Sequence, residues 1–206
     1  MNWPTFEALC AAAPLPEGVT LRAWREDEIV ELPSLLRRWF PTVSVGAESV
    51  FLDADFLRSR VFVEHSDFLT MAICQHGEVV GFQAFERQAA SKTLNGRLGV
   101  LAPEARAGFL GAFGFPLLEA LGRLMNAELL LVWVTLATKG QQMAAERRGF
   151  QLCGLVPGFD VDQQPDGTSR RVMEALYAKP LVESAWPSDD VLTPHTRKVF
   201  AAMHQR

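Results

Sequence analysis

The chain has 206 residues, which is long enough for one domain with a full hydrophobic core. Apolar residues make up 49% and charged residues 21%, as in ordinary globular proteins, and the net charge of −4 argues against nucleic acid as the main partner because no basic run stands out. Three cysteines stand far apart without metal-like spacing, so they indicate free thiols in a reducing compartment.

The N-terminal segment does not have the pattern of a secretory signal. It lacks a basic region, and Glu7, Pro14 and Pro16 interrupt its apolar stretch. No apolar run approaches the ~20 residues that a membrane-spanning helix needs. We therefore expect a cytoplasmic protein with neither a membrane nor a nucleic-acid partner.

The first part of the chain predicts three helices and three strands, of which the last two strands form a hairpin that turns at His76 and Gly77. These elements are a short helix at 5–13, a strand at Val19–Trp24, helices at 26–40 and 48–62, and paired strands at Phe68–Cys74 and Val79–Phe85. A polar connection at Ala89–Gly96 then leads to the next strand.

The stretch Arg97–Met125 reads as a strand, a basic turn with glycines and a long apolar helix. Leu98–Ala102 is the short apolar run of a buried strand, and Arg106, Gly108 and Gly111 follow it. This arrangement directs backbone N–H groups and the positive end of a helix to one point, which suits a phosphate.

Pro116 leaves two alternatives for that helix. Proline inside a helix removes a hydrogen bond, at roughly 3 kcal/mol, so the helix is either kinked or begins at Pro116 after a loop at Gly108–Phe115. We favour the kink because Phe109, Phe113 and Leu117 keep a four-residue spacing across the interval.

The last third of the chain predicts three more strands around one helix. These elements are a strand at Glu128–Leu136, a helix at 139–148, strands at Gln151–Val156 and Arg171–Ala178 separated by a polar loop at Gly158–Ser169, and a terminal helix at 195–203. Such an order predicts one α/β domain with helices on both sides of a mixed sheet.

Two motifs resemble the GNAT superfamily of N-acetyltransferases. Residues 101–112 read L-A-P-E-A-R-A-G-F-L-G-A, similar to the coenzyme A motif V-x-P-x-x-R-G-x-G-x-G of that family. Pro103, Arg106 and Gly111 match it, whereas Phe109 takes the place of the usual middle glycine and Gly108 stands one position early.

The second motif lies after the fifth expected strand, where the family often has an Asn followed by A-x-x-L-Y-E-x-x-G-F. Glu146, Gly149 and Phe150 match in register, while Thr138 stands at the Asn position and Ala145 at the Tyr position. The agreement in element order covers residues 19 to about 180.

The resemblance implies an α/β (α+β) fold with a mixed, mostly antiparallel sheet of about seven strands and helices on both faces. The domain would span residues 19–182, between an N-terminal extension at 1–18 and a C-terminal tail at 183–206 that is partly helical. Whether the protein forms a homodimer is left open at this point.

The implied function is transfer of an acetyl or other acyl group from acetyl-CoA to an unidentified small amine or protein amine, without a metal. The alternative is a non-catalytic acyl-CoA-binding or interaction domain. In GNAT enzymes two parallel strands splay around the thioester, here Leu98–Ala102 and Leu131–Leu136. The implied cofactor-binding residues are Val100, Leu101, Ala102, Arg106, Ala107, Gly108, Phe109, Leu110, Gly111 and Thr138.

Glu86 and Tyr177 are the candidate catalytic residues. Glu86 ends a strand beside apolar residues, so a raised pKa would suit it as the base, although a solvated acid at a strand end is the alternative. Tyr177 is the only tyrosine and could replace the acid that Ala145 cannot supply, although a strand tyrosine is more often a core residue. In GNAT folds the second helical region borders the acceptor pocket, so Glu48 and the nearby Asp53 and Asp55 could attract a cationic amine, although a solvated helix face explains them as well.

Overall fold

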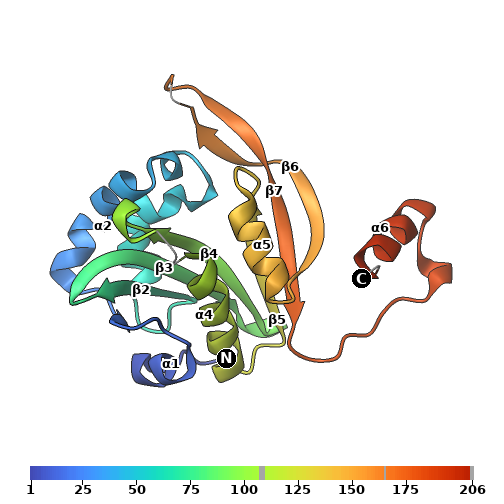
Figure 1. Ribbon diagram of the computed structural model, residues 1–206, viewed down its shortest axis with the longest axis horizontal. Coiled ribbons are helices and arrows are strands. Elements are labelled where there is room, and N and C mark those ends of the chain that lie inside the picture. Colours follow the sequence, from blue (N-terminus) through green and yellow to red (C-terminus); the bar gives the residue numbers. More distant parts are fainter. Residues whose placement is uncertain (107–109, 165, 205–206) are drawn as a thin grey trace.

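The computed structural model describes residues 1–106, 110–164 and 166–204. Its centre is one seven-stranded sheet with the order β1-β2-β3-β4-β5-β7-β6 (Figure 1). The strands are β1 Val19–Arg22, β2 Phe68–Gln75, β3 Glu78–Gln88, β4 Thr93–Leu101, β5 Leu129–Thr135, β6 Gln151–Gln163 and β7 Ser169–Pro180. Strands β4 and β5 run parallel and the other neighbouring pairs run antiparallel, which confirms the expected mixed, mostly antiparallel sheet.

Helices cover both faces of the sheet and enclose two hydrophobic clusters. The longer helices are α1 Phe6–Ala12, α2 Glu26–Trp39, α4 Leu110–Leu124, α5 Lys139–Arg147 and α6 Pro194–His204. Buried residues of α1, α4 and α5 form one cluster with the sheet, and buried residues of α2 and the segment after it form the other. The protein therefore has the three layers that the element order predicts.

Helix α4 includes Pro116, so the alternative of a helix that begins at that residue is wrong. Its apolar spacing explains the outcome, because Phe113, Leu117 and Leu121 are all buried in the same cluster. Phe109 lies outside the described residues.

The segment expected as one helix at 48–62 consists of short turns instead. They are the 3₁₀ turn η2 Ala47–Leu52, the short helix α3 Ala54–Phe56 and the π-helical turn η3 Leu57–Val61. Asp53 causes the first break, because its extended backbone leaves the helix and its side chain accepts hydrogen bonds from the N–H groups of Asp55 and Phe56.

The loop expected at Gly158–Ser169 is mostly a strand pair. Strand β6 continues to Gln163 and pairs with β7 through Gln163↔Ser169, while the register shifts between Val156 and Asp160. Strand β4 likewise begins at Thr93, inside the segment expected to be a polar connection. In both places polar residues at strand positions hide the apolar signal that sequence reading uses.

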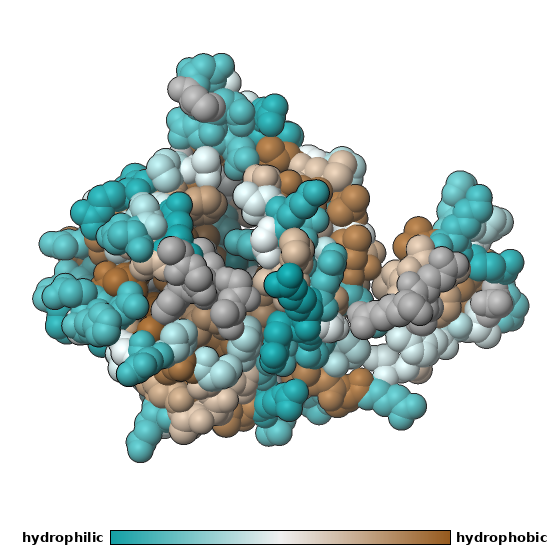
Figure 2. All heavy atoms as spheres, in the orientation of Figure 1, coloured by the Kyte–Doolittle hydropathy of each residue, from teal (hydrophilic) through white to brown (hydrophobic). Residues whose placement is uncertain are grey.

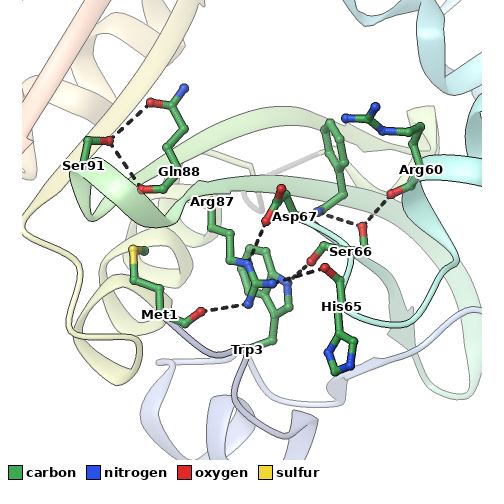
Figure 3. A network of polar contacts seen from close by, with 10 residues as sticks. Met1, Trp3, Arg60, His65, Ser66, Asp67, Arg87, Gln88 and Ser91 are labelled. Atoms are coloured by element: carbon green, nitrogen blue, oxygen red, sulfur yellow. Dashed lines mark hydrogen bonds and ion pairs between the residues drawn. The ribbon is translucent and has the colours of Figure 1, made fainter.

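Hydrogen bonds and a cation–π contact attach the N-terminal segment to the sheet (Figure 3). Arg87 on β3 donates to the backbone oxygen of Met1 at 2.8 Å and lies over the Trp3 ring, with the guanidinium carbon 5.4 Å from its centroid. Trp3 in turn donates from its indole nitrogen to the backbone oxygen of Ser66 at 2.9 Å. These contacts, with buried Leu9 on α1, join residues 1–18 to the domain core.

Helix α6 lies beside the outer strand β6, at the end of a long connection from β7 (Figure 1). Apolar residues stay exposed along β6, among them Leu152 and Leu155 (Figure 2). A cavity of about 520 Å³ separates this strand from Val199, Ala202 and Met203 of α6. In the described part of the chain, no helix has both the length and the apolar content to cross a membrane.

Candidate active site

Strands β4 and β5 separate halfway along their length. Their ladder begins at Thr93↔Leu129 and ends at Gly96↔Val132, although β4 continues to Leu101 and β5 to Thr135. Beyond Gly96 and Val132, β4 and β5 therefore no longer pair with each other, as the GNAT resemblance implied.

A cavity of about 330 Å³ lies at this separation on the side of α4 and α5; we call it the helix-side cavity. Its lining includes Gly96 of β4, Val132 of β5, Gly114 of α4, and Thr138 and Gly140 at the start of α5. A Cβ atom added at Gly114 or Gly140 would meet nothing within 4 Å. Beside these two glycines the cavity is therefore open up to the backbone, which leaves room for a flexible, chain-like ligand.

A second cavity of about 130 Å³ lies on the other side of the separation; we call it the acidic cavity. Its acidic residues come from two elements of the sheet and one turn, namely Glu48, Asp160, Asp162 and Glu174. Trp133 and Phe159 form an apolar wall, with stacked rings whose centroids are 3.7 Å apart. Arg97, Gly99, Trp133 and Gln141 line both cavities, so the two meet at the separated strands.

Arg97 on β4 binds two carboxylates at this junction. Its Nε lies 3.0 Å from Oε1 of Glu48, and its Nη1 donates to Oε2 of Glu86. The three side chains are only 23–26% exposed, so the pairs are partly shielded from solvent. Burial raises the pKa of Glu48, and Arg97 opposes this rise.

Glu174 on β7 was not among the residues that the sequence singled out. It lies opposite Thr135 of β5 and lines the acidic cavity. Burial, followed by the charges of Asp160, Glu48 and Asp162, raises its pKa to about 7. The sequence signal for it is weak: Glu174 lies in R-V-M-E-A-L-Y, where alternation alone places it on the face opposite Tyr177.

The two expected catalytic residues occupy different surroundings. Glu86 does not end its strand, because β3 continues to Gln88. It is paired with Arg97 and is absent from the described lining of both cavities. Tyr177 is 1% exposed and donates to Oε1 of Glu146 at 2.9 Å. Burial and the Glu146 carboxylate raise the pKa of Tyr177 to about 12, and it too is absent from the described lining.

The residues expected to bind the cofactor fall into three groups. Val100, Leu101 and Ala102 are buried at the end of β4, and Thr138 lies in the helix-side cavity. Arg106 donates from Nε to the backbone oxygen of Leu101 at 3.1 Å and from Nη2 to that of Trp39. Leu110 and Gly111 begin α4, whereas Ala107, Gly108 and Phe109 lie outside the described residues.

The three acids before β2 have separate positions. Glu48 lines the acidic cavity, whereas Asp53 caps α3 and Asp55 lies on the surface 3.5 Å from Arg58. Across the described ranges, no group of three or more His, Cys, Asp or Glu side chains is placed to hold a metal ion.

Comparison with known proteins gives the fold. No protein-family model and no curated protein matches the chain. The ribosomal-protein-S18-alanine N-acetyltransferase from Escherichia coli is similar in structure with a TM-score of 0.57 at 13% identity, over 85% of this chain and 99% of that one. RimL, a ribosomal L7/L12 alpha-N-protein acetyltransferase in complex with coenzyme A, has a TM-score of 0.60 at 13% identity, over 82% of this chain and 97% of that one.

A third similar structure is yncA from Salmonella typhimurium with its cofactor acetyl-CoA. It has a TM-score of 0.59 at 14% identity, over 84% of this chain and 99% of that one. The chain therefore has the fold of the GNAT N-acetyltransferases.

Proposed function

We propose that the protein is an N-acetyltransferase that moves an acetyl group from acetyl-CoA to an amine. The observation that carries the proposal is the pair of cavities that meet at Arg97, Gly99, Trp133 and Gln141. Two reactants can enter such a site from opposite sides and meet at the separated strands, which makes their reaction effectively unimolecular.

The helix-side cavity fits the cofactor chain. Gly114 and Gly140 leave open space along it, and the backbone N–H groups at the start of α5 suit an anionic or polar group near Thr138. Acetyl-CoA, when bound, supplies the thioester whose acetyl group is transferred. Arg106 is directed to backbone oxygens of Leu101 and Trp39, so its part would be to hold the β4 end rather than to contact phosphate.

The acidic cavity suits the acceptor. Its carboxylates would attract an ammonium group, and the Trp133–Phe159 wall would cover an attached apolar part. An amine is mostly protonated at neutral pH, so it also needs a group that removes its proton before it can attack.

Two measurements test this function. Calorimetry should detect acetyl-CoA binding, and a panel of small amines and peptides should release free thiol from acetyl-CoA in the presence of the protein. Thiol release above the uncatalysed rate with at least one acceptor is the expected result. Its absence with every acceptor would contradict the proposal.

A non-catalytic acyl-CoA-binding domain is the second candidate. Ala145 stands where the family often has its tyrosine, and Tyr177 is buried against Glu146. Under this alternative, acetyl-CoA would bind in the calorimeter while no amine released thiol.

A further inference from the structure

We propose that Glu174 is the catalytic residue that takes the proton from the acceptor ammonium in the acidic cavity; this inference rests on the proposed function. The residue lies on β7 opposite Thr135, at the end of β5 where the two parallel strands have separated. Its side chain lines the cavity that adjoins the helix-side cavity at Arg97 and Trp133. An amine held in this cavity would therefore lie close to Glu174 and to the junction of the two cavities.

Glu174 differs from most of the nearby carboxylates in its hydrogen-bond and ion-pair partners. Glu48 and Glu86 are bound to Arg97, and Asp160 accepts a hydrogen bond from the N–H of Ala47 at 2.6 Å. A carboxylate that is already held by a cation or a donor has fewer oxygen lone pairs free for an incoming ammonium. Among the described residues, Glu174 and Asp162 are the cavity acids without such a partner.

The charges that face Glu174 come from three elements. Glu48 of η2, Asp160 and Asp162 of β6 and Arg97 of β4 line the same cavity, together with the neutral Thr135 and Gln141. Arg170 lies opposite Asp162 in the hairpin but lines a different cavity.

Burial, followed by the like charges of Asp160, Glu48 and Asp162, raises the pKa of Glu174 to about 7. A base with a pKa near the working pH is the efficient choice for this step. The neighbouring acids also hold the ammonium in place while Glu174 removes its proton.

The reaction balances in protons and electrons. The ammonium gives one proton to the Glu174 carboxylate, and the lone pair that this frees forms the bond from nitrogen to the acyl carbon. The carbon–sulfur bond breaks, and the second nitrogen proton goes to the departing thiolate. The products are an amide, free CoA thiol and one proton on Glu174, which then passes to solvent.

The test compares two acceptors in wild type and in Glu174→Gln. Butylamine or 1,4-diaminobutane must lose a proton before attack, whereas the nitrogen of acetohydrazide is already neutral at pH 7. With the alkylamines, kcat/KM of the wild type should rise with pH through an apparent pKa near 7. Glu174→Gln should lower it about 10²–10⁴-fold and remove that rise, while the rate with acetohydrazide should change less than about 5-fold.

Each alternative result is decisive. If Glu174→Gln slows both acceptors equally, or keeps the rise near pH 7, the residue is not the proton acceptor although the transferase function stands. Loss of that rise in Glu86→Gln instead would assign the proton to Glu86. If wild type releases thiol with neither acceptor nor any other amine, the proposed function falls and this inference falls with it. Glu78→Gln, at an exposed position at the start of β3, is the matched control for removal of a carboxylate.

Discussion

The surroundings of Glu174 disfavour its charged form. Asp160, Asp162 and Glu48 carry like charge nearby, and partial burial removes water that would stabilise the carboxylate. Arg97, a cation that lines the same cavity, already pairs with both Glu48 and Glu86. The site therefore holds a destabilising charge where an incoming cation would relieve it, as at many functional sites.

This cost gives a prediction that does not depend on turnover. The pKa of Glu174 is raised to about 7 in the folded protein, above the ordinary value of 4.5, so its ionisation lowers stability as the pH rises through that interval. Glu174→Gln removes the effect and should raise the free energy of unfolding by about 1–3 kcal/mol at pH 8. Urea unfolding at pH 5 and pH 8 measures it, and the gain should shrink at pH 5. An equal gain at both pH values would contradict the raised pKa.

Gly114 offers a prediction about the other cavity. A Cβ atom at this position meets nothing within 4 Å. Replacing a glycine inside a helix by leucine also improves helix propensity by up to about 1 kcal/mol. Gly114→Leu should therefore fold at least as stably as wild type. The leucine would occupy the helix-side cavity and should weaken acetyl-CoA binding at least tenfold. Calorimetry and thermal unfolding together check this.

Gly114→Ala is the matched control, because it adds only the Cβ atom and should retain most of the affinity. Full acetyl-CoA affinity in Gly114→Leu would place the cofactor outside this cavity.

The sequence predicted the surroundings of the site better than its residues. Thr138, which was singled out by its place in a family motif, lines the helix-side cavity, and Glu48, which was expected to attract a cationic amine, lines the acidic cavity. Glu174 was missed because only the register between β5 and β7 brings it to Thr135, and that register depends on pairing between distant segments. The catalytic role of Glu86 stays a prediction, and the structure shows that its carboxylate pairs with Arg97.

At the level of elements, prediction succeeded where a regular apolar period exists. The stripe of α4 outweighed the penalty of Pro116, as its four-residue spacing indicated. Prediction failed at 48–62 and 158–169. Asp53 is an N-cap within an apolar pattern, and the polar faces of the β6–β7 hairpin conceal their alternation.

The start of α2 provides a test at this scale. Glu28 accepts a hydrogen bond from the N–H of Arg25 at 2.9 Å and pairs with Arg22 at 2.6 Å, which joins the helix to β1. The hydrogen bond from Arg22 lowers the pKa of Glu28 to about 2. Stability from this contact is therefore full above pH 4.5 and is lost as the pH falls toward 2.

Glu28→Gln should lower the free energy of unfolding by about 1–3 kcal/mol at pH 7, and by less at pH 3. Urea unfolding at the two pH values measures the difference. Glu31→Gln, at an exposed position on the same helix, is the control and should stay within about 0.5 kcal/mol. A Glu28→Gln loss that did not shrink at pH 3 would argue against the Arg22 pair as its cause.

Across the whole molecule, the two ends of the chain are attached very differently. The N-terminal segment buries Leu9 and places Met1 and Trp3 against Arg87, whereas the connection from Glu183 to Ser188 is exposed. Helix α6 packs in part on its own connection, through a T-shaped contact between Trp186 and Phe200 with centroids 5.6 Å apart. Stability should therefore reside in residues 1–182.

Two truncations test this difference. Deletion of residues 184–206 removes no residue of either buried cluster, so it should cost at most about 1 kcal/mol, which lowers the unfolding midpoint by roughly 2–4 °C in a chain of this size. Deletion of residues 1–18 removes buried Leu9 and the anchor at Arg87, so it should prevent stable folding, since truncating one buried leucine alone costs about 2–5 kcal/mol. Thermal unfolding followed by circular dichroism compares the two variants with the full chain. A larger loss from the C-terminal deletion would mean that α6 stabilises β6 more than its few contacts indicate, and that the exposed apolar residues of β6 need this cover.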